Sequence, residues 1–124
     1  MDFKDFKNTT LVPIDFTEDS LTALDHASSI AHVAEHDTYQ VTLLHVMEGI
    51  EMDRPYLQGN PLPDNMNKAL MIEGAINRFE KIINERLKNV NALVTYAVTG
   101  GKVYKQVAEL GKKMQADTIV MGTR

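Results

Sequence analysis

The pattern of apolar and polar positions divides the chain into two kinds of segment. Short segments are almost entirely apolar, and in longer segments apolar residues recur at regular intervals. Four blocks, at residues 9–16, 39–46, 92–98 and 117–121, are nearly continuous in apolar or β-branched residues. Such runs are typical of strands buried on both faces of a parallel sheet. Pro13, inside the first block, cannot donate a ladder hydrogen bond, so we expect it near the carboxyl end of its strand, where pairing stops.

Between these blocks, apolar residues recur every three or four positions, which predicts helices that each bury one face. The first helix is expected to begin at Thr17, whose hydroxyl can cap it, with acidic residues in its first turn. The second spans residues 65–89, and the third follows Gly100 and Gly101, which are expected to break the third strand. The apolar positions are Leu21, Leu24, Ala27, Ala31 and Ala34 in the first, Ile72, Ile76, Phe79, Ile83, Leu87 and Val90 in the second, and Val103, Val107, Leu110 and Met114 in the third.

Strands that alternate with helices predict an α/β fold with an open, Rossmann-like parallel sheet and right-handed crossovers. We expect one domain over residues 1–124, because the length suits one core and no repeat or linker divides the chain. The connection at residues 47–65 contains Pro55, Pro61 and Pro63 and no period. A connection this long in a compact domain is usually functional or mobile.

Composition narrows the classes of function. The net charge is -4, and no basic cluster is longer than Lys112-Lys113, which argues against nucleic-acid binding. No apolar run approaches the roughly 20 residues of a membrane span, so no membrane insertion is expected. The N-terminus is polar and of mixed charge, unlike a signal peptide, and the chain has 0 Cys. We therefore expect a cytoplasmic protein.

Ligands of open α/β sheets bind at the carboxyl ends of the strands, where the strand order reverses. If the first and last strands pair, Asp15 lies beside Gly122 at that position. The carboxylate could accept ribose hydroxyls or bind a metal, and the glycine backbone could approach a phosphate. Alternatively, Asp15 caps the helix that starts at Thr17, and Gly122 is a turn residue. The residues alone slightly favour this second interpretation.

Other motifs argue against specific chemistries. The sequence contains neither a GxGxxG fingerprint nor a P-loop, and a turn role is favoured over an anion cradle for Gly100-Gly101-Lys102. His32 and His36 could share a helix face, but no third ligand is evident, so we predict no metal site. The serines lack the strained turn of a catalytic nucleophile, so we predict no catalytic residue.

Three segments resemble the universal stress protein family: TTLVPIDFTEDS at residues 9–20, VTLLHVME at 41–48 and ADTIVMGTR at 116–124. The resemblance covers essentially the whole chain in element order. It implies a Rossmann-like fold of the adenine-nucleotide alpha-hydrolase type, with sheet order 3-2-1-4. In ATP-binding members, the matching positions lie near the nucleotide. These positions are Pro13, Ile14, Asp15, Val46, Met121 and Gly122.

The sequence departs from the family pattern after Gly122, where the family's phosphate loop G-x2-G-x9-G-[ST] begins. The later glycines and the family's fifth strand would follow Arg124. We therefore expect a C-terminally incomplete first domain that holds only the adenosine side of the site. Each backbone N–H of a phosphate loop contributes about 1.5–3 kcal/mol. On that basis this chain is expected to bind ATP, with or without Mg²⁺, weakly or not at all.

The resemblance implies a stress-response module that binds an adenine nucleotide, ATP or AMP, as a homodimer or beside a tandem second domain. The alternative is a nucleotide-independent dimerising or scaffold protein of the same fold. An enzyme of the related nucleotide-activating class would need catalytic motifs that the sequence lacks. Any ATP hydrolysis is therefore expected to be slow and incidental.

Overall fold

The computed structural model describes residues 8–33, 39–88, 90 and 92–122. Expectations that concern Ala34, His36, Asn89, Thr123 and Arg124 lie outside the described residues. The elements are β1 (Asn8–Pro13), α1 (Glu18–Val33), β2 (Tyr39–Glu48), β3 (Tyr56–Leu57), α2 (Met66–Ile82), the π-helical η2 (Ile83–Leu87), β4 (Leu93–Gly101), α3 (Val103–Lys113) and β5 (Thr118–Ile119). The predicted alternation of strands and helices is confirmed.

The strands form one sheet in the order β3-β4-β2-β1-β5. β1, β2, β4 and β5 pair in parallel, which confirms the predicted Rossmann-like sheet and the order 3-2-1-4 of the predicted strands. The additional strand β3 pairs antiparallel with β4 and lies in the connection that was expected to be irregular. A strand of two residues near three prolines has no period that sequence analysis could detect.

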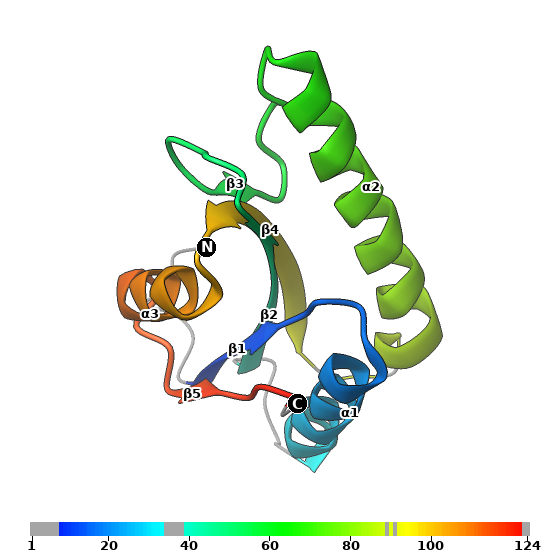
Figure 1. Cartoon of the computed structure of the whole chain (residues 1–124). Helices are drawn as coiled ribbons and strands as arrows, with labels where there is room; N and C mark the ends of the chain where they lie inside the picture. Colours follow the sequence, from blue (N-terminus) through cyan, green and yellow to red (C-terminus); the bar gives the residue numbers. More distant parts are fainter. Residues whose placement is uncertain (1–7, 34–38, 89, 91, 123–124) are drawn as a thin grey trace.

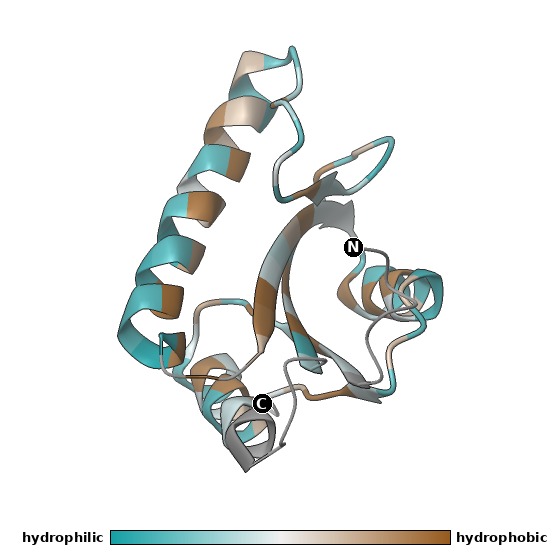
Figure 2. Ribbon diagram, turned by 180° about the vertical axis from the view of Figure 1, so that it is seen from behind, coloured by the Kyte–Doolittle hydropathy of each residue, from teal (hydrophilic) through white to brown (hydrophobic). Residues whose placement is uncertain are grey.

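The helices form layers on both sides of the sheet. In Figure 1, α1 and α2 lie on one side of the sheet and α3 lies on the other. The apolar stripes of the helices point inward, as the colouring of Figure 2 shows. The core on the α1/α2 side contains Val12, Ile14, Leu24, Ala27, Tyr39, Val41, Leu43, Met47, Ile72, Ala75, Phe79, Ile82, Leu87, Tyr96 and Val98. The core on the α3 side contains Leu11, Leu44, Ala97, Val107, Leu110 and Met114.

The predicted bounds of the third and fourth strands need correction. β4 continues through Gly100 and Gly101, which pair with β2, so the glycine pair does not break the strand. A Cβ at Gly100 would lie 2.0 Å from the carbonyl oxygen of Ile50, so the close approach of the turn after β2 requires glycine there. The predicted buried strand at 117–121 contains only Thr118 and Ile119, and both are exposed because β5 lies at the edge of the described sheet.

β1 ends at Pro13 and not, as predicted, at Phe16. The next residue, Ile14, still donates its N–H to the carbonyl oxygen of Leu44 at 2.7 Å. Pro13 thus occupies the last ladder position, in agreement with the expectation that a proline is tolerated where pairing stops. None of the described helices combines the length and apolar character that a membrane crossing requires.

Candidate functional site at the carboxyl ends of the strands

Asp15 occupies the exit from β1 and organises the start of α1. Its Oδ1 accepts hydrogen bonds from the backbone N–H of Thr17, at 3.0 Å, and from the Thr17 hydroxyl. The Thr17 hydroxyl oxygen in turn accepts from the N–H of Ser20 at 3.4 Å. Thr17 therefore caps α1, as predicted, and the hydrogen bonds that Asp15 accepts hold Thr17, the residue before the helix, in place. Because Asp15 is also exposed, its carboxylate borders solvent at the ligand-binding edge of the fold.

The residues on either side of Asp15 are held in place. His45 donates from Nδ1 to the carbonyl oxygen of Ile14 at 2.9 Å, since a carbonyl can only accept. Phe16 adopts the left-handed conformation at φ 65°, which is unusual for a bulky residue. Its ring packs against His45 and Phe79, with centroid distances of 4.9 and 5.4 Å. The Arg78 guanidinium lies 4.8 Å from the Phe16 ring centroid.

Three apolar residues from three different strand ends share the α3 side of the sheet. Pro13 pairs with Leu44 of the α3-side core, and Val46 follows two positions later on the same face. Met121, after β5, packs partly buried against the same core, as does Val46. Pro13 is buried, so Val46 and Met121 supply the exposed part of this surface; we call the three residues the apolar platform. A flat aromatic ligand such as a nucleobase suits a surface of this kind, with Asp15 at its border.

Gly122 lies against the first turn of α1, so the chain after β5 runs toward that helix (Figure 1). A Cβ at Gly122 would lie 2.5 Å from the Asp19 carbonyl oxygen and 2.9 Å from the Ser20 nitrogen. No side chain fits in this space, so the close approach of two backbones accounts for the glycine. The β1–β5 pairing that was expected to bring this region to Asp15 is present.

The structure therefore brings Pro13, Asp15, Val46, Met121 and Gly122 to one end of the sheet. The side chain of Ile14, by contrast, is only 2% exposed and belongs to the α1/α2-side core. Its backbone N–H and carbonyl are occupied by Leu44 and His45. Ile14 can thus position Asp15, but its side chain does not reach the platform.

Sequence reasoning missed the anchoring roles of Phe16 and His45. Phe16 was assigned to the strand, because an aromatic residue in a left-handed turn leaves no signal in the apolar pattern. His45 falls within the second apolar block, which predicts a strand histidine with a hydrogen-bonded polar tip; the structure confirms this, but its partner, the Ile14 carbonyl, depends on the β1–β2 register. Within the described part of the chain, no group of three or more His, Asp or Glu side chains is arranged to bind a metal.

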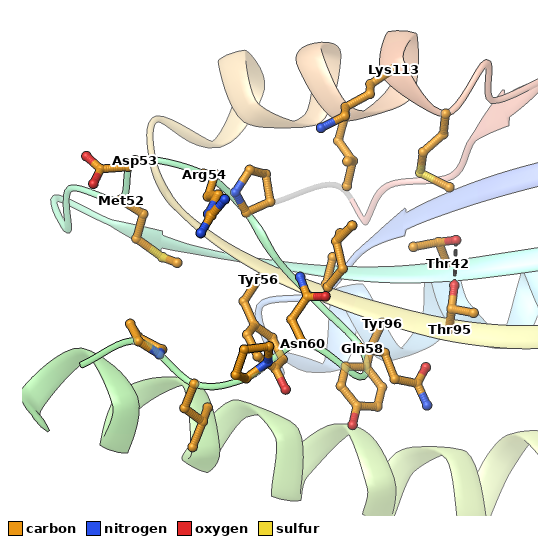
Figure 3. Close-up of a pocket in the computed structure, with 18 of the residues that line it drawn as sticks. Thr42, Met52, Asp53, Arg54, Tyr56, Gln58, Asn60, Thr95, Tyr96 and Lys113 are labelled. Carbon is orange, nitrogen blue, oxygen red and sulfur yellow. Dashed lines mark hydrogen bonds between the residues drawn. The ribbon is translucent and has the colours of Figure 1, made fainter. Parts of the chain in front are cut away.

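The structure also contains a large groove of about 1530 Å³ beside β4. Figure 3 shows it between α3 and the 52–65 connection, with Lys113 on α3, Arg54 and Tyr56 on the connection, and Thr42 and Thr95 on the sheet. We call this space the β4 groove. The long connection that sequence analysis marked as functional or mobile forms one of its walls.

A mostly parallel sheet with helices on both faces and a polar residue at the β1 exit defines a Rossmann-like α/β domain. The family model of the universal stress protein family matches residues 8–124, and the chain belongs to this family. A comparison with curated proteins finds no match.

Several solved structures have the same fold. The hypothetical protein MJ0577 aligns with a TM-score of 0.71 and 23% identity, covering 94% of this chain and 75% of that chain. Universal stress protein UspA from Lactobacillus plantarum aligns with a TM-score of 0.57 and 17% identity, covering 96% and 81%. A universal stress protein in complex with cAMP aligns with a TM-score of 0.57 and 16% identity, covering 91% and 74%. At these identities the likeness establishes the fold alone.

Proposed function

We propose that this protein is a stress-response module that binds the adenosine part of an adenine nucleotide at the carboxyl ends of β1, β2 and β5. The observation that carries the proposal is the apolar platform, Pro13, Val46 and Met121, bordered by the exposed carboxylate of Asp15. Membership of the universal stress protein family supports it, and so does the similar fold of a family member solved in complex with cAMP.

In the proposed complex, the adenine ring lies on the platform and Asp15 accepts hydrogen bonds from the ribose hydroxyls. Burial of an aromatic base against aliphatic side chains supplies the apolar part of the affinity. A hydrogen bond from a hydroxyl to a carboxylate contributes about 1.5–3 kcal/mol. None of the platform residues carries a positive charge that could bind a phosphate. We therefore propose that they select the nucleoside and do not distinguish nucleotides by their number of phosphates.

The test is calorimetric titration of the protein with adenosine, AMP, cAMP and ATP. Adenosine is expected to bind, and Asp15→Asn is expected to weaken it by about tenfold, the loss of one charge-assisted hydrogen bond. The matched control is Asp64→Asn, which removes an exposed carboxylate that precedes α2. If none of the four compounds binds saturably at millimolar concentration, or if both variants behave alike, the proposal is wrong.

We further propose that the protein binds the nucleotide without using Asp15 as a catalytic base. The carboxylate already accepts two hydrogen bonds from Thr17, which suits a role in orienting the loop and the ribose. Any slow ATP hydrolysis should therefore persist in Asp15→Asn when ATP is saturating. A loss of turnover at saturation, with unchanged affinity, would contradict this assignment.

The exposed edge at β5 supports a second candidate function, a dimerising or scaffold protein that needs no nucleotide. β5 is an edge strand of the described sheet, with Ile119 43% exposed, and a strand at a sheet edge is a template for another strand. Light scattering of the protein and of Ile119→Lys, with and without ATP, separates the candidates. A dimer that dissociates in the variant and ignores ATP favours the scaffold.

A further inference from the structure

Polar side chains occupy the amino-terminal half of the α3 side of the sheet, far from the apolar platform. Gln40 and Thr42 lie on this face of β2, and Thr95 pairs with Thr42 on β4. Gln40 is only 3% exposed and Thr42 only 5%. A buried amide needs hydrogen-bond partners for both its ends, because burial removes it from water.

Among the residues that the structure describes, the Gln40 amide has hydrogen-bond partners at its Nε2 end and none at Oε1. Its Nε2 donates to the hydroxyl oxygens of Thr42 at 3.3 Å and Thr95 at 3.4 Å, and these hydroxyls bond each other at 2.9 Å. Within the described part of the chain, Gln40 Oε1 is buried and has no hydrogen-bond partner. Both hydroxyls can donate as well as accept. The amide can therefore turn by 180° and keep one hydrogen bond to the threonine pair, in which Oε1 accepts the remaining hydroxyl proton, and Nε2 then becomes the end without a partner.

This incomplete set of hydrogen bonds lies in the floor of the β4 groove. Gln40, Thr42 and Thr95 all line the groove, and Figure 3 shows Thr42 and Thr95 bonded at one end of it. Val46 of the apolar platform is about 20 Å from Gln40 along β2, at the usual rise of about 3.3 Å per residue. The groove floor is thus separate from the proposed nucleotide site.

We propose that the β4 groove binds a small molecule through an amide edge, in which an N–H donor lies beside a C=O acceptor. Such an edge satisfies Gln40 in either orientation: the ligand N–H donates to Oε1, or the ligand C=O accepts from Nε2. In the first orientation, the remaining hydroxyl proton of the Thr42–Thr95 pair can donate to the ligand C=O, and in the second, a threonine hydroxyl oxygen can accept from the ligand N–H. Primary carboxamides and the lactam edges of nucleobases have this chemistry.

The groove is large enough for this ligand, and a neighbouring side chain can move to expose Gln40. Its volume exceeds the about 300–1,000 Å³ of typical small-molecule sites, so the ligand fills only the floor. Gln40 Oε1 is closed off from solvent, and binding therefore includes the shift of a neighbouring side chain. Met114 on α3 lines the same groove and has an unbranched, adaptable side chain.

The experiment titrates the ¹⁵N-labelled protein with four probes and follows its NMR spectrum. Nicotinamide has a primary amide edge and uracil has a lactam edge. Nicotinate replaces the N–H donor by a carboxylate, and N,N-diethylnicotinamide keeps the carbonyl but has no N–H. We expect nicotinamide or uracil to shift the side-chain amide signals of Gln40, with a dissociation constant on the order of 10 mM for so small a ligand. Whichever binds more tightly identifies the source of the edge.

The variants test whether Gln40 carries the recognition. Gln40→Met keeps the length of the side chain and removes both polar ends, and should weaken binding by about fivefold to tenfold. Thr95→Val removes one hydroxyl and gives the same test if Gln40→Met does not fold. The matched control is Gln106→Met, because Gln106 bonds Thr99 near the start of α3 and does not line the groove.

Each result decides the proposal. Binding of nicotinamide or uracil that is lost in Gln40→Met but kept in Gln106→Met supports it. Binding of nicotinate alone overturns it, because the charges of the groove wall would then account for the site. Those charged residues are Arg54, Lys68, Lys113, Asp53 and Asp64. Equal binding of N,N-diethylnicotinamide, or no shift of Gln40 with any probe, also overturns it, and leaves water as the partner of the unsatisfied end of the amide. Loss of adenosine binding would not affect this result, since the floor lies elsewhere.

Discussion

The two faces of the sheet bury side chains of different size and chemistry. The α1/α2 face contains a continuous aromatic cluster, in which Phe79 stacks on Tyr96 with centroids 5.4 Å apart and contacts Phe16. The α3 face buries a small aliphatic core at the carboxyl half of the strands and polar side chains at the amino half. Most of the apolar stabilisation is thus on the α1/α2 face.

The two faces of the sheet therefore have different roles. The α1/α2 face holds the strand exits in place, because Phe16 and the His45 ring both pack against it next to Asp15. The α3 face borders both candidate binding surfaces, the apolar platform at one end and, at the other, the β4 groove, which also reaches Val94 and Tyr96 of the opposite face. One face supplies rigidity, and the other borders the candidate binding surfaces.

The largest expected effect is on the α1/α2 face. Phe79 is fully buried, so Phe79→Ala should lower the free energy of unfolding by about 3–5 kcal/mol, the cost of a cavity of this size. Leu110→Ala, on the α3 face, should cost only about 2 kcal/mol, because Leu110 borders the open groove and its surroundings can relax.

Urea denaturation of both variants measures this contrast. A loss for Leu110→Ala that equals or exceeds the loss for Phe79→Ala would show that the α3 face contributes at least as much to stability as the α1/α2 face. Unchanged m-values are the control that both variants unfold from a comparably compact state.

The next effect compares two glycines. Gly100→Ala should destabilise by about 1–3 kcal/mol, because its Cβ would overlap the Ile50 carbonyl and force the turn after β2 to move. Gly74→Ala, on α2, is the matched control, since its Cβ meets nothing within 4 Å. Because alanine is the better helix former, this control should gain about 0.5–1 kcal/mol. Thermal unfolding of both variants checks the prediction, which fails if the two shifts have the same sign.

The sequence predicted the layers of the fold better than the details of its edges. Apolar periodicity, a local pattern, correctly placed Phe79 and Leu24 in the core. The capping chemistry of Thr17 correctly located the start of the first helix. The roles of Gly100 and Gly122 were not predictable. Each is required by the backbone of a distant segment, and only the tertiary structure brings those segments together.

The candidate site shows the same division. Asp15 could be predicted as a site residue from its position after an apolar strand. Val46 and Met121 could be predicted only from the resemblance to the universal stress protein family. The anchoring of Phe16 under Arg78, and the unsatisfied amide of Gln40, depend on side-chain contacts between elements. One signal for the groove was visible: Gln40 and Thr42 alternate in an otherwise apolar strand, which places two polar groups on one face.

A smaller effect is expected at the junction between the rigid face and the platform. Thr17→Ala removes a helix cap and one hydrogen-bond donor to Asp15, and should cost about 1 kcal/mol. Thr17→Ser keeps the hydroxyl and is the control. The measurement is urea denaturation together with adenosine titration of both variants. A weaker affinity for adenosine in Thr17→Ala, restored in Thr17→Ser, would show that the cap also orients Asp15. An affinity equal to that of the unmodified protein in both variants would limit Thr17 to a stabilising role.

The smallest expected effect is the response of the aromatic face to alkaline pH. Burial raises the pKa of Tyr96 above its ordinary value of 10.0, and the charge of Glu80 and the neighbouring Tyr56 act in the same direction. The folded state therefore prefers the neutral phenol. The stability that Tyr96 contributes in this way is complete below pH 10 and is lost as the pH rises through the folded-state pKa. Tyr96→Phe lacks this loss, so its free energy of unfolding should fall less between pH 9 and 11 than that of the unmodified protein.

Parallel curves of the free energy of unfolding against pH for the two proteins would mean that the phenol of Tyr96 ionises as readily in the folded chain as in the unfolded one. The α1/α2 face would then be more open to water at Tyr96 than its packing against Phe79 indicates.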